Sequence, residues 1–246
     1  MFGSSIQVAV FKTVILTALV LLAAVLLKGK VRWLWLAPIP LLTLVKHLLL
    51  AEGGAGSFGD WIPGQYNWEG KLLVIPLWIA IICACFGDRS SAIGLTRKQN
   101  GPFRNTAFGV ATFCAISWAL AAVFQFQGVK SGSIWDVLYQ TSMPTIEEEL
   151  WFRGIMLAML LEAFTPTGEQ KPPVVAIILA ALITSLSFWG AHSIGTDGDW
   201  GFTFDVWGNL QAGGFGALFV IVRIGTGSLV LPMLLDTWVN TAVYFL

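Results

Sequence analysis

The sequence predicts an all-α integral membrane protein with about eight transmembrane helices. Of its 246 residues, 56% are hydrophobic and only 11% are charged, and the mean hydropathy is +0.76. A soluble globular domain is about 25% charged. Because a chain this apolar has too few polar side chains to cover a surface that faces water, an ordinary cytosolic enzyme and a disordered chain are both excluded.

The charge balance and the cysteines exclude further classes. Lys and Arg together number 14, and Asp and Glu together also number 14. There is therefore no excess of basic residues to bind a phosphate backbone, and no nucleic-acid partner is expected. Cys83, Cys85 and Cys114 all lie inside apolar runs. Their spacing does not fit a zinc site, and we expect them to be small apolar packing residues.

Eight apolar segments approach the length of roughly 20 residues that a membrane-spanning helix needs. They are 8–27, 33–50, 70–87, 106–127, 144–164, 174–195, 205–224 and 229–246. The first is expected to remain as an uncleaved helix, because its positive charges follow it and no small-residue cleavage site precedes a polar start. A four-residue Gly- and Ser-containing turn, 225–228, separates the last two.

Lys and Arg fall mainly in alternate loops. If the N-terminus lies outside, the cytoplasmic loops contain Lys28, Lys30, Arg32, Arg89, Arg97, Lys98, Arg104, Lys171 and Arg223. The outer loops then contain only Lys71 and Lys130. Since cytoplasmic loops carry the excess of basic residues, this count predicts an outer N-terminus.

The fifth segment contains the densest group of charges. Glu147 follows Pro144–Thr145, and an acid at a helix start near the membrane interface explains it. Arg153 lies two turns further into the apolar helix, where a single charge is costly. Glu149 is four residues before Arg153, so the two are expected to pair on one face. Glu148 points to another face and is expected to be free for chemistry.

Two other segments place polar groups at a similar depth. His192 lies near the outer end of the sixth segment, opposite Glu148 in an antiparallel pair of helices. Asp236 and Asn240 are four residues apart on the last segment and share a face. This convergence favours a water-activating site in the outer half of the membrane, and a structural polar network is the alternative. His47 is expected to be a packed residue.

The seventh segment is rich in glycine. Gly213 and Ala217 form a small-xxx-small face that predicts close packing against another helix. The functional alternative is a thin wall beside the site, with Asn209 and Gln211 lining the same cavity. Ser185 and Ser187, near His192, are expected to be hydroxyls that pack within the helix.

Three motifs together resemble a known family. They are Glu148-Glu149-x-x-x-Arg153-Gly154, Phe188-x-x-x-His192, and the polar pair Asp236-x-x-x-Asn240. This set is similar to the CAAX protease and bacteriocin-processing (CPBP or Abi) enzymes, the glutamate-type intramembrane endopeptidases. The resemblance covers residues 90–246. It implies one membrane domain, with helices 1–3 in residues 1–87, a protease core in 88–246 and an active site in an intramembrane cavity.

The resemblance also implies a mechanism. Glu148 is the general base for a water molecule that His192 helps to position, while Glu149 and Arg153 hold each other. Asn240 stabilises the oxyanion. The family usually has His where this chain has Asp236. Asp236 can donate a hydrogen bond to the oxyanion only when protonated, or it can stay ionised and orient His192.

The resemblance points to no cofactor. A competing zinc site would use Glu148, His192 and Asp236, although one His is poor for zinc. The expected partners are membrane lipid and a peptide or membrane-anchored protein substrate, in a bacterial or archaeal cell membrane. Two other functions stay open. One is a non-catalytic membrane scaffold or immunity protein, which Asp236 favours. The other is a transporter, which would need repeated halves that are not evident.

Overall fold

The structure, a computed structural model, describes every residue except 1, 55–61, 64–65, 126–131 and 246. The first part of the chain forms α1 (Phe2–Leu26), α2 (Trp33–Leu36), α3 (Pro38–Gly54), α4 (Trp68–Ile81), the π-helix η1 (Ile82–Phe86), the 3₁₀ turn η2 (Gly87–Arg89) and α5 (Arg104–Gln125). The rest forms α6 (Ile134–Glu148), the π-helix η3 (Glu149–Met156), α7 (Leu157–Phe164), α8 (Val174–Ser193), β1 (Ile194–Thr196), β2 (Phe202–Phe204), α9 (Leu210–Thr226), α10 (Val230–Thr241) and η4 (Ala242–Tyr244).

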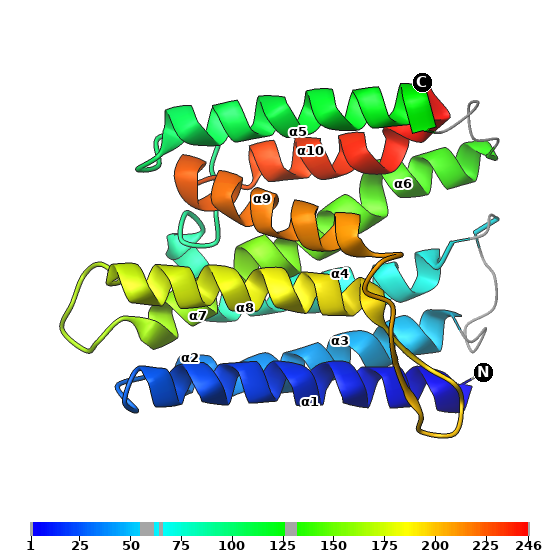
Figure 1. Ribbon diagram of the computed structural model, residues 1–246. Coiled ribbons are helices and arrows are strands. Elements are labelled where there is room, and N and C mark those ends of the chain that lie inside the picture. Colours follow the sequence, from blue (N-terminus) through cyan, green and yellow to red (C-terminus); the bar gives the residue numbers. More distant parts are fainter. Residues whose placement is uncertain (1, 55–61, 64–65, 126–131, 246) are drawn as a thin grey trace.

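The helices lie side by side as a bundle (Figure 1). Four spans in the described residues are long and apolar enough to cross a membrane: Ser4–Leu26, Trp33–Ala51, Trp68–Arg89 and Val174–Ser193. Large apolar side chains such as Val14 and Phe113 are 59% and 65% exposed, as expected of surfaces that face lipid tails. The predicted all-α integral membrane fold is therefore confirmed, whereas the count of eight spans is not.

Both chain termini and the β1–β2 hairpin lie at one end of the bundle, on the right in Figure 1. We call this the N-terminal end. The turns that join α1 to α2 and α7 to α8 lie at the opposite end. Lys130 and residues 126–127 of the predicted fourth helix fall outside the described residues.

The predicted start of the fifth helix at residue 144 is wrong. The helix begins at Ile134, after a capping box in which Ser133 Oγ accepts from the Asp136 N–H and Asp136 Oδ2 accepts from the Ser133 N–H. This reciprocal arrangement satisfies two backbone donors at the helix start. Pro144, which suggested a start, lies inside the helix. The three acids are therefore 13 to 15 residues into a continuous helical path rather than at its beginning.

The predicted seventh helix, 205–224, is also displaced. The helix α9 begins at Leu210, and a short antiparallel hairpin precedes it, pairing Ile194 with Phe204. Gln7 on α1 ties the hairpin down, since Gln7 Oε1 accepts from Thr196 Oγ1 at 2.8 Å. A hairpin was not predicted because strands of three residues carry almost no alternation pattern.

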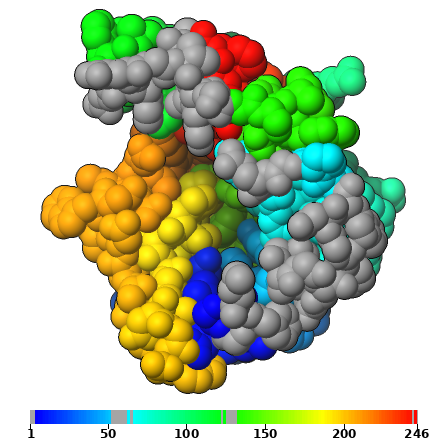
Figure 2. All heavy atoms as spheres, turned by 90° about the vertical axis from the view of Figure 1, so that its right-hand side faces the viewer, coloured from blue at the N-terminus to red at the C-terminus, as the bar shows by residue number. Residues whose placement is uncertain are grey.

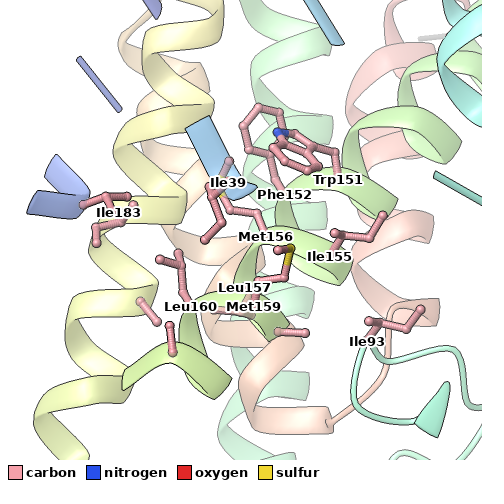
Figure 3. Close-up of a cluster of buried hydrophobic side chains, with 14 of the residues drawn as sticks. Ile39, Ile93, Trp151, Phe152, Ile155, Met156, Leu157, Met159, Leu160 and Ile183 are labelled. Carbon is pink, nitrogen blue, oxygen red and sulfur yellow. The ribbon is translucent and has the colours of Figure 1, made fainter. Parts of the chain in front are cut away.

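The apolar core surrounds η3 and α7 (Figure 3). Its labelled members are Ile39, Ile93, Trp151, Phe152, Ile155, Met156, Leu157, Met159, Leu160 and Ile183. Trp151 of η3 stacks on Trp78 of α4 with ring centroids 4.5 Å apart. The segment that contains the acids therefore runs through the core of the bundle, where side chains of several other helices surround it.

Close packing of α8 against α9 is confirmed. A Cβ atom on Gly213 would lie 3.1 Å from the Trp189 ring, and one on Gly216 would lie 3.1 Å from Phe188. The prediction that Ala217 is the second small residue of this packing face is wrong, because Ala217 is exposed. Gly216, one residue earlier, takes that place.

Candidate active site

The three acids lie where α6 passes into the π-helix η3. Glu147 and Glu148 end α6, and Glu149 begins η3. A π-helical segment widens the backbone spiral and is often found at functional sites. Glu147 and Glu148 share Lys71 as a partner, whereas Glu149 pairs with Arg153 of η3.

Glu147 is fully buried and is held by two lysines. Lys46 Nζ on α3 lies 2.9 Å from Glu147 Oε1, and Lys71 Nζ on α4 lies 2.6 Å from Oε2. The indole N–H of Trp78 also points at Oε1, at 3.4 Å. The interpretation of Glu147 as an interfacial helix-start acid is therefore wrong. A buried carboxylate is tolerated here because cations from two other helices compensate its charge.

The helical spacing suggested that Glu148 is free, but the structure shows that its carboxylate is paired. Lys71 Nζ, which already binds Glu147, also donates to Glu148 Oε1 at 2.8 Å. Lys71 was expected in an outer loop, but it is buried in the first turn of α4, whose start Asn67 caps by accepting from the Gly70 N–H. The expectations for Glu148 and for Lys71 failed because these two partners are 77 residues apart in the sequence.

The predicted pair of Glu149 and Arg153 is confirmed. Arg153 Nη1 donates to Glu149 Oε1 at 2.7 Å, and both side chains are fully buried. Arg153 also approaches the Gly216 carbonyl at 3.4 Å and lies over the Phe188 ring, 4.0 Å from its centroid. A cation on an aromatic face is favourable when both are desolvated. Arg153 thus fastens η3 to α8 and α9.

His192 lies in the last turn of α8, beside Glu148. Its Nε2 lies 3.7 Å from Glu148 Oε2, and its Nδ1 lies 2.9 Å from the carbonyl oxygen of Phe188. When Nδ1–H donates to that carbonyl, the neutral ring presents the lone pair of Nε2 toward Glu148. The distance to Glu148 exceeds a direct hydrogen bond, so a third polar molecule can bind to both groups.

Asp236 and Asn240 of α10 line a cavity together with Glu148 and His192. Asp236 Oδ2 accepts hydrogen bonds from Thr145 Oγ1 at 3.0 Å and from Asn240 Nδ2 at 3.2 Å. Among the described residues Asp236 makes no hydrogen bond to His192, whose Nδ1 is directed to Phe188 instead. The structure therefore does not contain the arrangement in which Asp236 orients His192.

Two cavities meet at Glu148 and His192, which line both. The aromatic cavity, about 370 Å³, is lined by Trp118, Tyr139, Phe188, Phe215 and Phe219 together with Asp236, Asn240, Asn209 and Gln211. The basic cavity, about 470 Å³, is lined by Lys12, Lys46, His47 and Lys71 together with Glu147. Viewed from the N-terminal end, the molecule is hollowed between α1, α4 and α8 (Figure 2).

The zinc alternative names Glu148, His192 and Asp236 as ligands. Within the described ranges, no group of three or more His, Cys, Asp and Glu side chains is placed to hold a metal ion. Asp236 is occupied by Thr145 and Asn240 rather than directed at His192. Ser185 donates to the Ala181 carbonyl of its own helix at 2.8 Å, as expected of a packing hydroxyl.

Sequence reasoning missed the contribution of the first helices. Lys12, Lys46 and Lys71 all reach the site from α1, α3 and α4. A signal for Lys12 and Lys46 was present, because a cation inside an apolar helix needs an anionic or polar partner. The sequence of a single helix does not show which partner that is.

The fold and the buried site together define an integral membrane protein with a polar, cavity-lined centre. Residues 130–242 match the model of a family described as type II CAAX prenyl endopeptidase Rce1-like. The resemblance that the motifs indicated is thereby confirmed for this segment, which contains all three motifs. No curated protein and no solved structure matches the chain.

Proposed function

We propose that this protein is an intramembrane endopeptidase that hydrolyses a peptide bond in a membrane-anchored, lipid-modified or exported peptide or protein. The observation that carries the proposal is the Glu148–His192 pair at the junction of the two cavities, with Nε2 and Oε2 3.7 Å apart. Water can reach this pair from either cavity, and a peptide backbone can lie across it. The match to the Rce1-like family supports the same class.

Glu148 is the general base in this proposal. Its ion pair with Lys71 stabilises the carboxylate, which is the form that accepts a proton from water. His192 Nε2 accepts the second hydrogen bond of that water and so fixes its position. Proton transfer by a positioned side chain typically contributes ~10²–10⁴ in rate. The proton then passes from Glu148 to the leaving amine.

Asn240 is the oxyanion donor. One of its two amide hydrogens binds Asp236 Oδ2, at a nitrogen–oxygen distance of 3.2 Å, which leaves the second free to donate to a substrate carbonyl. Asn240 lines the aromatic cavity, the same cavity that Glu148 and His192 line. Asp236, in turn held by Thr145, positions the amide. Donors of this kind are worth ~10²–10³ in rate.

The aromatic cavity indicates an apolar substrate segment. Five aromatic side chains and Val239 line it beside the polar groups, and apolar walls with a few placed polar groups are typical of ligand sites. An anchored or lipid-modified peptide suits this lining. The site lies toward the N-terminal end of the bundle, and the count of basic loop residues predicts that this end faces the outside of the cell.

A second candidate function is a non-catalytic membrane scaffold or immunity protein. Asp236 favours it, because the resembled family usually has His at that position. A scaffold would still need the buried ion pairs of Glu147 and Glu149 for its fold. It would not need Glu148 to be both ionised and in contact with a cavity, so a variant of Glu148 separates the two functions.

The test compares the termini of membrane proteins by mass spectrometry in cells with the wild-type chain, with no chain, and with Glu148→Gln. A new terminus that is present only with the wild-type chain supports the peptidase and names its substrate. The control is Glu162→Gln, which alters an acid on α7 that pairs with Arg32 and Arg89 near the opposite end. If Glu148→Gln gives the wild-type termini while the deletion differs, the scaffold function is favoured.

Membrane orientation needs its own test. A unique cysteine is placed at Ser133 beside α6, or at Lys171 between α7 and α8, in a variant that lacks the three native cysteines. An impermeant thiol reagent applied to intact cells is expected to label position 133 and not position 171. Labelling at 171 alone would move the site to the cytoplasmic half.

A further inference from the structure

The basic cavity contains more positive charge than the mechanism uses. Among its described lining residues, Lys12, Lys46 and Lys71 face only two acids, Glu147 and Glu148. Lys46 and Lys71 are both ion-paired with those acids. On formal charge, one cation is therefore in excess in a part of the molecule where unpaired charge is costly.

The excess cation is Lys12. Its Nζ donates to the carbonyl oxygen of Ala191 at 2.7 Å, and no acid in the described part of the chain lies within ion-pair distance of it. Three ammonium hydrogens are available, so two remain for another acceptor. Ala191 directly precedes His192, which places Lys12 next to the proposed catalytic pair.

His47 lies in the same cavity with no hydrogen bond to any described residue. Its ring can donate from one nitrogen and accept at the other when neutral. Ser4 and Ser5 of α1 add hydroxyl groups to the lining. α1 and α3 therefore contribute polar groups to a cavity that contains one unneutralised positive charge.

We propose that this basic cavity binds the C-terminal carboxylate of the peptide substrate, with Lys12 as its principal partner. The inference rests on the proposed function, because a peptide lying across Glu148 and His192 extends into both cavities that they line. Its apolar part then occupies the aromatic cavity, and its other side enters the basic one. A volume of about 470 Å³ suits a short chain end.

The charge balance favours a carboxylate over a phosphate headgroup. A single excess cation matches a monoanion, whereas a more highly charged phosphate would face Glu147 and Glu148 in the same cavity. A carboxylate at the chain end also needs no particular side chain in the substrate. Lys12 and His47 would therefore act as specificity residues for a free carboxylate at the end of the substrate chain.

Binding is measured with short synthetic peptides, which serve as probes and are not the natural substrate. The full-length protein in detergent is titrated with N-acetyl-trileucine as the free acid and as the amide, and affinity is followed by thermal unfolding. We expect the acid to bind about 10- to 100-fold more tightly than the amide, since a hydrogen bond to a charged group is worth roughly that ratio. Equal affinity for acid and amide would overturn the proposal.

Variants of Lys12 assign the preference. Lys12→Gln keeps a donor for the Ala191 carbonyl but removes the charge, and it is expected to reduce the acid-to-amide ratio to about twofold or less. Lys12→Arg keeps the charge and is expected to retain most of the preference. The control is Lys171→Gln at the opposite end, where the exposed lysine has no role in the cavity. A preference that survives in Lys12→Gln would refute Lys12 as the partner.

Two further ligands distinguish the sources of the anion. N-acetyl-Leu-Asp-Leu amide has a side-chain carboxylate and no terminal one, and binding as tight as trileucine acid would overturn the assignment to the chain end. Dioctanoyl phosphatidic acid tests a lipid headgroup, and tighter Lys12-dependent binding than trileucine acid would do the same. Peptide hydrolysis is assayed separately. If the protein binds the free acid more tightly than the amide but hydrolyses no peptide, the proposed function is refuted and the carboxylate site is not.

Discussion

Lys71 Nζ and Glu147 Oε2 form a buried ion pair of 2.6 Å between α4 and the end of α6. The pair joins a helix outside the matched family segment to the acids inside it. Because Lys71 also binds Glu148 at 2.8 Å, the geometry of the proposed catalytic base depends on a residue far away in the sequence. The fold and the chemistry of this site are therefore expected to respond together to changes in α4.

Replacing Lys46 by Met is expected to destabilise the protein strongly. Glu147 would lose one of its two counter-ions while still fully buried, and breaking a buried pair typically costs ~3–5 kcal/mol. The double variant Lys46→Met with Glu147→Gln should recover much of the loss, because it removes the unpaired charge as well. Thermal unfolding of purified protein in detergent measures both, and equal melting temperatures for the single variant and wild type would contradict the prediction.

Glu149 and Arg153 are expected to behave as a coupled unit. Arg153→Met leaves Glu149 as an isolated buried carboxylate and should lower stability and activity together. Glu149→Gln combined with Arg153→Met should be less harmful than the sum of the two single changes. The thermodynamic cycle is completed by unfolding measurements on all four proteins, and strict additivity would show that the 2.7 Å contact contributes nothing.

Asn240→Ala is expected to reduce the rate of peptide hydrolysis by ~10²–10³ with little loss of stability, because it removes an oxyanion donor. Steady-state kinetics should show the effect in kcat rather than in KM. Asp236→Asn keeps an acceptor for Thr145 and should remain within about tenfold of wild type if Asp236 only positions Asn240. A loss as large as that of Asn240→Ala would instead assign Asp236 a direct role.

Glycines on α9 provide a test of helix packing with an internal control. Gly216→Ala would bring a Cβ 3.1 Å from the Phe188 ring and 3.3 Å from the Ser185 carbonyl, and overpacking of this kind typically costs ~1–3 kcal/mol. Gly214→Ala meets no described heavy atom within 4 Å and should be neutral or slightly stabilising. Similar melting temperatures for the two variants would contradict the predicted contact.

Local sequence features predicted much of the architecture. Long apolar runs identify α1 and α8 because the membrane requires both their length and their composition. The pairing of Glu149 with Arg153 followed from spacing alone, since both residues belong to one helical segment. The start of that segment was misplaced because Pro144 suits a first turn, whereas the capping box at Ser133 lies in a polar stretch that showed no apolar periodicity.

The composition of the site was only partly predictable, because its electrostatics depend on tertiary contacts. The partners of Glu147 come from α3 and α4, and no pattern within residues 144–164 indicates them. The intramembrane position of Lys46 was visible in the sequence, yet its acid partner could be chosen only after the helices were placed together. Helical spacing gives the face on which a side chain lies but not which helix covers that face.

The contact between Lys71 and the two acids has a consequence for how this chain can be divided or exchanged. Residues 130–242 contain Glu147 and Glu148, but the cations that neutralise them come from before residue 72. A chimera that joins this segment to the first helices of another protein would bring two acids into the membrane without their counter-ions. The part of the chain that must be transferred intact is thus longer than the segment that matches the family, and substitutions in its two parts must compensate each other.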